Sequence, residues 1–228
     1  MSAQKLRAYS VHFFTATGIA VAMWALISIY QHQLQLALWL LALAAIIDSV
    51  DGTLARKFNT PALADTFDGA LLDNIIDFVT WTVLPLFWGF VALNLPTWVL
   101  ALCATASVLG FSNKKAKTDD LFFLGFPSYW NIVILYCYFL EFTPFTSSII
   151  LVLCAILVFV PIKYIYPSRT PNGQALTITL GIIFIIQVAG LLYYYNQAPY
   201  WLVYSSLVFP AYYIAYSLLL NLYPNAGS

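Results

Sequence analysis

Charged residues are scarce in this sequence. Asp, Glu, Lys and Arg together make up 8% of the 228 residues, whereas 62% are hydrophobic. An ordinary soluble domain carries about 25% charged residues, so this composition excludes a soluble globular domain. The formal net charge is zero, which provides no basic surface for nucleic acid. We therefore expect an integral membrane protein with no nucleic-acid partner.

Cysteine and histidine are also rare, and none of them has the spacing of a disulfide framework or a metal site. Cys103, Cys137 and Cys154 lie singly in apolar runs, and packing is the expected role for each. His12 and His32 are isolated as well. We expect them to be packing or interface residues and not metal ligands.

Long apolar runs, separated by polar or Pro/Gly-containing breaks, account for most of the chain. A span takes about 20 residues, so 228 residues could supply about eight, and the pattern predicts an all-α bundle of about eight transmembrane helices. With no visible repeat or soluble linker, one domain over 1–228 is expected. A short amphipathic surface helix should precede the first span. The expected spans are 11–30, 35–57, 67–93, 97–112, 128–142, 147–166, 175–195 and 200–222.

Lysine and arginine are missing from every second connection between these spans. The connections without them are "QHQ", "NLP", "EFTPFT" and "NQAP". All nine Lys and Arg residues map to the side of the membrane that holds the N-terminus and the other connections. By the positive-inside rule, both termini are predicted to face the cytoplasm. Every acidic residue except Glu141 falls on that side too, so the chemistry is expected to face the cytoplasm.

Six aspartates crowd into "DSVDGTLARKFNTPALADTFDGALLDNIID", residues 48–77. Asp48 and Asp51 are three residues apart and share one face near the end of the second span. Asp73 and Asp77 are four residues apart and share one face near the start of the third. If the two faces meet, four carboxylates converge where two helices enter the membrane.

Such a cluster needs counter-charge. One aspartate at bilayer depth costs about 2.5–3.5 kcal/mol, and Arg56 alone cannot neutralise four carboxylates. Clustered oxygen ligands suit Mg²⁺ or Mn²⁺, so we expect two such ions, arranged for phosphoryl chemistry. A single aspartate can instead snorkel or cap a helix turn, and this alternative stays open for Asp65 and Asp68 in the intervening loop. A cation transporter would also bury acids, but it has no need of an arginine between two acidic pairs.

The acidic stretch also carries a longer motif. It resembles the signature of the CDP-alcohol phosphotransferase family, whose residues here are Asp48-x-x-Asp51-Gly52-x-x-Ala55-Arg56 and Gly69-x-x-x-Asp73-x-x-x-Asp77. The spacer 57–68 is longer than in the commoner form of the motif and resembles that of the bacterial phosphatidylcholine synthases. Three further segments share that resemblance: "RAYSVHFFTATG", "DNIID" and "KTDDLFFLGFPSYWN".

The resemblance implies a reaction and a setting. A phosphatidyl group would pass from CDP-diacylglycerol to choline with release of CMP, in a bacterial inner membrane, with Mn²⁺ or Mg²⁺ required and a homodimer expected by analogy. The implied metal ligands are Asp48, Asp51, Asp73 and Asp77. Asp77 would also be the general base for the choline hydroxyl, and Asp73 and Arg56 would act with it in catalysis. The implied cytidine and phosphate site comprises Asp48, Gly52, Ala55, Arg56 and Gly69.

Other residues are candidates for substrate contact. Arg169, in "YPSRTP", is a candidate for a substrate phosphate, whereas Lys114, Lys115, Lys117 and Lys163 are expected to set topology and attract anionic headgroups. A quaternary ammonium is best held by aromatic faces. The candidate walls are Trp81, Tyr129 and Trp130, although interfacial aromatics commonly serve as membrane anchors.

The acceptor alcohol is the remaining alternative. Serine, glycerol phosphate and inositol are acceptors in the same kind of reaction, and those with a carboxylate or phosphate would require extra basic residues near Asp77. The flanking sequence "GALLDNIIDFVTW" is neutral or aromatic apart from its aspartates. This flank favours a cationic acceptor.

Overall fold

The computed structural model describes residues 2–64 and 66–222. They are mostly helical, and by their contacts the chain divides into two compact units, Met1–Asn94 and Leu95–Ser228, called here the N-terminal and C-terminal units. The prediction of a helical membrane protein is confirmed at this level. Each unit is described by itself below.

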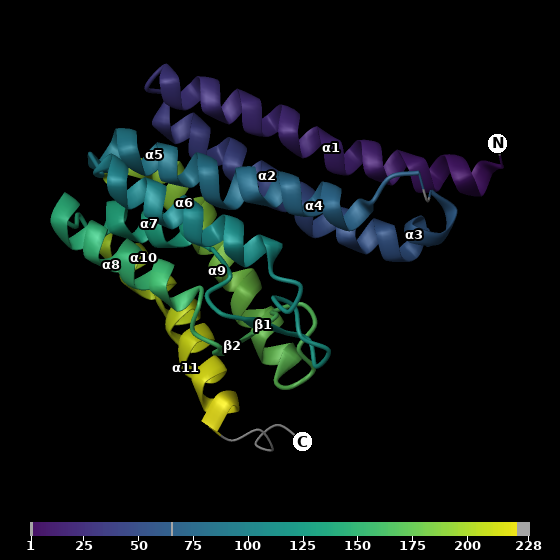
Figure 1. Ribbon diagram of the computed structural model, residues 1–228. Helices are drawn as coiled ribbons and strands as arrows, with labels where there is room; N and C mark the ends of the chain where they lie inside the picture. The colour runs from purple at the N-terminus through teal and green to yellow at the C-terminus, as the bar shows by residue number, and fades with distance from the viewer. Residues whose placement is uncertain (1, 65, 223–228) are drawn as a thin grey trace. The chain divides into compact units, whose positions relative to one another are not determined.

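The N-terminal unit is built from α-helices and one π-helical segment, η1. Helix α1 lies alongside α2 and also contacts α3, α4, η1 and α5 (Figure 1). The elements are α1 (Ala3–Tyr30), α2 (Leu34–Lys57), α3 (Thr60–Leu63), α4 (Gly69–Asp77), η1 (Phe78–Val83) and α5 (Leu84–Leu93). Because α1 contacts each of these elements, its side chains help to fix their positions within this unit.

The expectation of a separate surface helix before the first span is wrong. Helix α1 starts at Ala3, where the side chain of Ser2 caps it by accepting a hydrogen bond from the Lys5 N–H (3.3 Å). The helix then continues without a break to Tyr30. No proline interrupts this stretch, so nothing in the backbone ends the first turns before the apolar run begins.

The predicted third span is not one uniform α-helix. Its residues form α4, then the π-helical segment Phe78–Val83, then α5, which has Pro85 in its first turn. Proline has no N–H and its ring crowds the carbonyl four residues earlier, here that of Trp81. We attribute the wider turn to this proline, since a helix adjusts locally to π geometry when an i→i+4 bond is lost.

The C-terminal unit combines helices with a two-stranded sheet. Helix α6 packs against α8, and α11 packs against strand β2. The elements are α6 (Thr97–Ser112), β1 (Phe122–Leu124), α7 (Trp130–Phe139), α8 (Pro144–Leu157), β2 (Lys163–Ile165), α9 (Gln174–Tyr194), η2 (Tyr195–Gln197), α10 (Tyr200–Ser206) and α11 (Val208–Leu222).

The antiparallel pair β1–β2 is a short addition to the predicted helical architecture. Phe122 pairs with Ile165 and Leu124 with Lys163, so the predicted helix over 147–166 ends early, at Leu157. Asn221 in α11 fixes the strand from the side, since its Oδ1 accepts from the Lys163 N–H (3.0 Å) and its Nδ2 donates to the Lys163 carbonyl (2.6 Å). These bonds satisfy strand groups that would otherwise lack partners.

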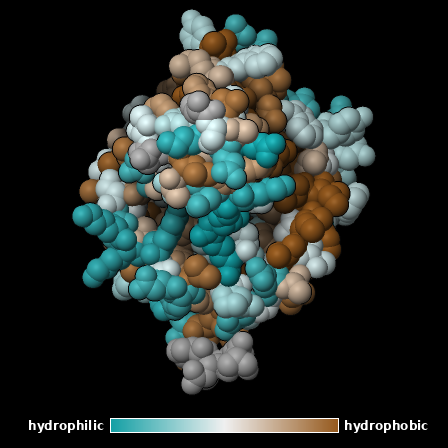
Figure 2. All heavy atoms as spheres, turned by 90° about the vertical axis from the view of Figure 1, so that its right-hand side faces the viewer, coloured by the Kyte–Doolittle hydropathy of each residue, from teal (hydrophilic) through white to brown (hydrophobic). Residues whose placement is uncertain are grey.

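Within residues 2–64 and 66–222, five helical segments are long and apolar enough to cross a membrane. They are Ala3–Tyr30, Leu34–Lys57, Gly69–Leu93, Gln174–Gln197 and Tyr200–Leu222, and the remaining apolar helices, α6, α7 and α8, are shorter. Large apolar side chains on these segments are exposed, among them Phe13 (70%) and Ile186 (66%), as expected for contact with lipid. Figure 2 shows both hydrophobic (brown) and hydrophilic (teal) side chains on the surface.

Candidate active site

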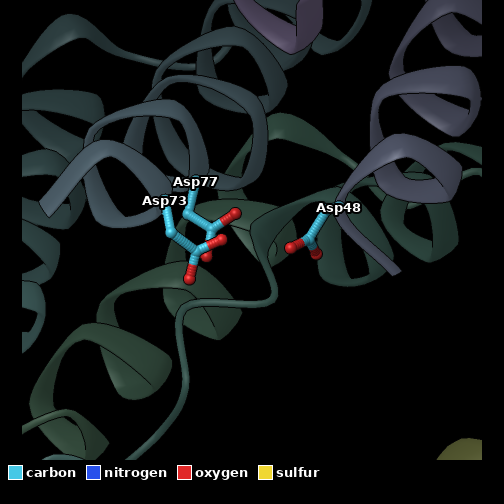
Figure 3. Close-up of side chains that lie close together, drawn as sticks. All are labelled: Asp48, Asp73 and Asp77. Carbon is cyan, nitrogen blue, oxygen red and sulfur yellow. The ribbon is translucent and has the colours of Figure 1, made fainter. Parts of the chain in front are cut away.

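Three aspartates from two helices of the N-terminal unit come together. Asp48 lies on α2, and Asp73 and Asp77 lie on α4. One carboxylate oxygen from each lies within 4.8 Å of the others, and all three residues are half-buried. In Figure 3 the carboxylates of Asp73 and Asp77 project side by side from one helix, and Asp48 lies opposite them. The predicted convergence of these aspartates is confirmed.

The local sequence explains why α4 presents its aspartates this way. Asp68 is the N-cap, and its Oδ1 accepts a hydrogen bond from the Leu71 N–H (3.0 Å), which stabilises the first turn. Asp73 and Asp77 are four residues apart and therefore share a face. The capping alternative for Asp68 is thus confirmed, whereas Asp65 lies outside the described residues.

The fourth predicted ligand, Asp51, lies beside this group. It is 5% exposed and lines the same small pocket as Asp48, Asp73 and Asp77. It also interacts with the hydroxyl of Thr15 on α1. Asp51 is not among the three residues whose oxygens meet within 4.8 Å, so a role as ligand remains a proposal.

The donor set suits a divalent cation. Three carboxylates offer oxygen ligands only, the type that Mg²⁺ and Mn²⁺ prefer. Holding three like charges this close is costly unless positive charge is shared among them. The residues present therefore fit a hard metal ion, with Asp48, Asp73 and Asp77 as the group that the structure brings together.

The small and basic residues of the motif lie at the last turns of α2. Arg56 is exposed, and its Nη2 donates to the Thr53 hydroxyl (3.1 Å). A Cβ placed on Gly52 would lie 3.6 Å from Arg56 Nη1, so the guanidinium folds back over this glycine. Ala55 is half-buried. Arg56 thus presents its guanidinium on the helix that carries Asp48.

Gly69 has a different neighbour. It is the first residue of α4, and a Cβ there would lie only 2.9 Å from Cε1 of His12. Sequence analysis assigned Gly69 to the nucleotide site and His12 to packing, and did not connect the two. The resemblance in "RAYSVHFFTATG" was the available signal, but nothing in the sequence pairs His12 with the start of α4.

The aromatic candidates have distinct surroundings. Trp81 is half-buried in the π-helical segment. Tyr129, in the C-terminal unit, is half-buried with its ring edge-on to Tyr213 (centroids 6.0 Å apart). Trp130 is fully buried, and its indole N–H donates to the Ser107 hydroxyl (2.6 Å), which also accepts from Ser128 (3.0 Å). These contacts indicate packing for Trp130.

Arg169 is exposed and lies over the ring of Tyr166, 5.1 Å from its centroid. The neighbouring Thr170 fixes the loop, because its hydroxyl accepts from the Tyr166 N–H (2.7 Å) and donates to the Leu121 carbonyl (2.7 Å). Lys163, by contrast, is paired with Asp120 (Nζ to Oδ2, 2.5 Å). This is the one ion pair found among the described residues.

The Asp120–Lys163 pair leads to a modest prediction for stability. The hydrogen bond from Lys163, with a second from Thr118, lowers the pKa of Asp120. A carboxyl with a lowered folded-state pKa stabilises the fold above its unfolded pKa of about 3.9, and this contribution is lost as the pH falls through the folded-state pKa. Because both side chains are exposed, Asp120→Asn should cost less than about 1 kcal/mol at pH 7.

Unfolding of the purified protein in detergent at pH 7 and at about pH 2 would measure this. The difference between wild type and Asp120→Asn should be smaller at the lower pH, because the contribution of the carboxylate is lost as the pH falls through its lowered folded-state pKa. An equal difference at both pH values would show that the amide disturbs the loop for another reason.

Comparison with known proteins identifies the family of this chain. Residues 10–162 match the model of the CDP-alcohol phosphatidyltransferase family. A phosphatidylcholine synthase of Legionella pneumophila is 39% identical over 73% of this chain and 67% of its own length. One from Legionella bozemanae is 42% identical over 65% and 71%, and one from Rhizobium meliloti is 30% identical over 98% and 94%. The chain belongs to the CDP-alcohol phosphatidyltransferase family.

Proposed function

We propose that this protein transfers the phosphatidyl group of CDP-diacylglycerol to choline and releases CMP. The observation that carries the proposal is the meeting of Asp48, Asp73 and Asp77 within 4.8 Å, on the two helices that bear the family motif. The names of the relatives, phosphatidylcholine synthases from several bacteria, support choline as the acceptor.

In this proposal Asp48, Asp51, Asp73 and Asp77 hold Mn²⁺ or Mg²⁺, with two ions in all. When bound, such ions neutralise the pyrophosphate and the charge that develops on the departing CMP. Asp77 takes the proton of the choline hydroxyl as its oxygen attacks phosphorus, because an alcohol is a poor nucleophile near neutral pH. The bond between phosphorus and the CMP oxygen then breaks, and CMP leaves.

Arginine and small residues bind the nucleotide end of the donor. Arg56 pairs with phosphate oxygens, and Gly52, Ala55 and Gly69 leave room beside the backbone. Support comes from the exposed guanidinium of Arg56, which donates a hydrogen bond to the neutral hydroxyl of Thr53. Arg169, in the C-terminal unit, is a separate proposal for contact with a substrate phosphate, since it is exposed and lies on a loop that Thr170 holds in place.

The residues around Asp77 favour a cationic acceptor. Phe78 and Trp81 follow Asp77 directly in the π-helical segment, and aromatic faces attract quaternary ammonium groups. Trp81, which lies in the same unit as Asp77, is proposed as a wall of the choline site. Tyr129, in the C-terminal unit, stays a candidate through its residue type alone. Trp130 is the weakest of the three candidates because it is fully buried.

The membrane arrangement is also a proposal. Both termini and the acidic group face the cytoplasm of a bacterial inner membrane, the three shorter apolar helices join the five long segments to make eight spans, and two copies form a homodimer. The absence of Lys and Arg from alternate connections supports the orientation. The family match extends across both units, which supports a single functional domain.

The decisive test is CMP release by purified protein in detergent with CDP-diacylglycerol and Mn²⁺. Choline, serine, glycerol phosphate and inositol are added one at a time. Release with choline alone is expected. Release with another alcohol in place of choline would overturn the acceptor, and no release with any alcohol, from protein shown to be folded, would overturn the proposed transfer.

A further inference from the structure

His12 faces the segment that joins the two acid-bearing helices. It lies on α1, is 7% exposed, and its Nε2 is 3.3 Å from the carbonyl oxygen of Ala64. Because a carbonyl only accepts, Nε2 donates this hydrogen bond. Ala64 itself is fully buried, so the ring lies against a part of the connection that is packed away from solvent.

The same imidazole packs on the first residue of α4. A Cβ on Gly69 would lie 2.9 Å from His12 Cε1 and 3.5 Å from Nδ1, so only glycine leaves space for the ring here. Phe67 meets the ring edge-on, with centroids 5.8 Å apart. His12 therefore contacts the connection before α4 and the start of α4 itself.

Tyr9, one turn earlier on α1, contacts the same connection. Its hydroxyl is 2.7 Å from the Thr66 hydroxyl, and its ring is edge-on to Phe67 (6.2 Å). Two consecutive turns of α1 thus hold the end of the long spacer on either side of Phe67. Sequence analysis left this spacer without a structural role beyond its unusual length.

The position of α4 determines where its aspartates point. Asp73 follows Gly69 by one helical turn and Asp77 by two, on the same face. Helix α1 contacts α4 again at Gly18, where a Cβ would lie 3.0 Å from Ile76 Cγ2. Contacts at both ends of a short helix fix its position and its rotation about its own axis.

We propose that His12 is a positioning residue for the metal site: it holds the start of α4 so that Asp73 and Asp77 face Asp48. The inference rests on the proposed metal-binding role of these aspartates. It does not depend on which alcohol is the acceptor.

The first test measures Mn²⁺ binding to the full-length protein in detergent, without substrates, by the electron paramagnetic resonance signal of free Mn²⁺. His12→Leu should bind about tenfold more weakly, because fewer molecules hold the binding geometry. His12→Gln keeps an N–H donor for the Ala64 carbonyl and should bind within about twofold of wild type. His32→Gln, at the exposed turn after α1, is the matched control and should bind as wild type does.

Kinetics separate positioning from general damage. For His12→Leu, the Mn²⁺ concentration that gives half-maximal CMP release should rise about tenfold, while kcat at saturating Mn²⁺ stays within about twofold of wild type, since excess ion repopulates the competent geometry. Wild-type Mn²⁺ affinity in His12→Leu would overturn the proposal. So would failure of His12→Gln to restore affinity.

A double-mutant cycle tests the contact itself and decides the matter if His12→Leu does not fold. Gly69→Ala places a methyl against the imidazole and should weaken Mn²⁺ binding in the wild-type background. In the His12→Ala background the methyl has room, so the same change should weaken Mn²⁺ binding by a smaller factor. An equal loss of Mn²⁺ affinity in both backgrounds would overturn the proposed contact between His12 and Gly69. Wild-type protein that binds Mn²⁺ yet does not release CMP with choline would refute the proposed function alone.

Discussion

Asp77→Asn should lower the rate of CMP release with choline by about 10²- to 10⁴-fold, the range that a general base contributes. Asparagine keeps the shape of the side chain but cannot accept the hydroxyl proton, and it removes one charge from the group in which Asp48, Asp73 and Asp77 meet within 4.8 Å. The measurement is the initial rate of CMP release in detergent at saturating CDP-diacylglycerol, choline and Mn²⁺.

The comparison with Asp48→Asn separates a ligand from a base. Excess Mn²⁺ should recover part of the activity of Asp48→Asn by mass action, whereas it cannot replace the base in Asp77→Asn. Glu141→Gln is the control for loss of a carboxylate elsewhere, because Glu141 is exposed and follows α7 in the C-terminal unit. Asp77→Asn with more than about a tenth of wild-type activity would place the base elsewhere.

Gly125→Ala should destabilise the protein by more than about 3 kcal/mol, a size that marks a specific steric mechanism. Gly125 has φ +82°, and a Cβ there would lie 2.2 Å from the carbonyl oxygen of Val158. Its N–H also donates to the Ile162 carbonyl (2.9 Å), directly after strand β1. Backbone atoms cannot move independently as the end of a flexible side chain can. The substitution must therefore distort either the turn at Gly125 or the β1–β2 pairing.

Thermal unfolding in detergent and the yield of monodisperse protein would measure the effect. Gly181→Ala is the matched control, because Gly181 lies inside α9 and a Cβ there would meet Phe209 at 3.7 Å, an ordinary contact. That change should be neutral or stabilise the protein by up to about 1 kcal/mol through helix propensity. A Gly125→Ala protein as stable as Gly181→Ala would contradict the close approach of Gly125 to Val158.

The acidic group was predictable because its information is local. Asp73 and Asp77 share a face through their spacing, and Asp48 lies on the helix that precedes them in the sequence. The apolar runs likewise predicted most helices to within a few residues, and α6 at Thr97–Ser112 agrees with the expected bounds. Such features depend on periodicity within one segment or on the meeting of two consecutive helices.

The features that sequence analysis missed depend on longer-range pairing. Strands β1 and β2 have three residues each, too few to show the alternation that marks a longer strand. The whole of α7 and α8 lies between them in the sequence. Trp130 was a candidate for choline contact because of its residue type, and its bond to Ser107 could not be seen from spacing. The contact of His12 with Gly69 escaped prediction for the same reason.

The π-helical segment between Asp77 and Pro85 has a consequence for how this sequence can diverge. In a regular α-helix each residue turns the chain by about 100°, so one insertion or deletion rotates everything beyond it. A π turn arises by accommodating one more residue and can return to α geometry by losing it. A single-residue deletion within Phe78–Val83 can therefore be absorbed locally by a return to α geometry. Such a deletion would leave the acidic half of this span facing as it does now, together with the apolar half beyond it.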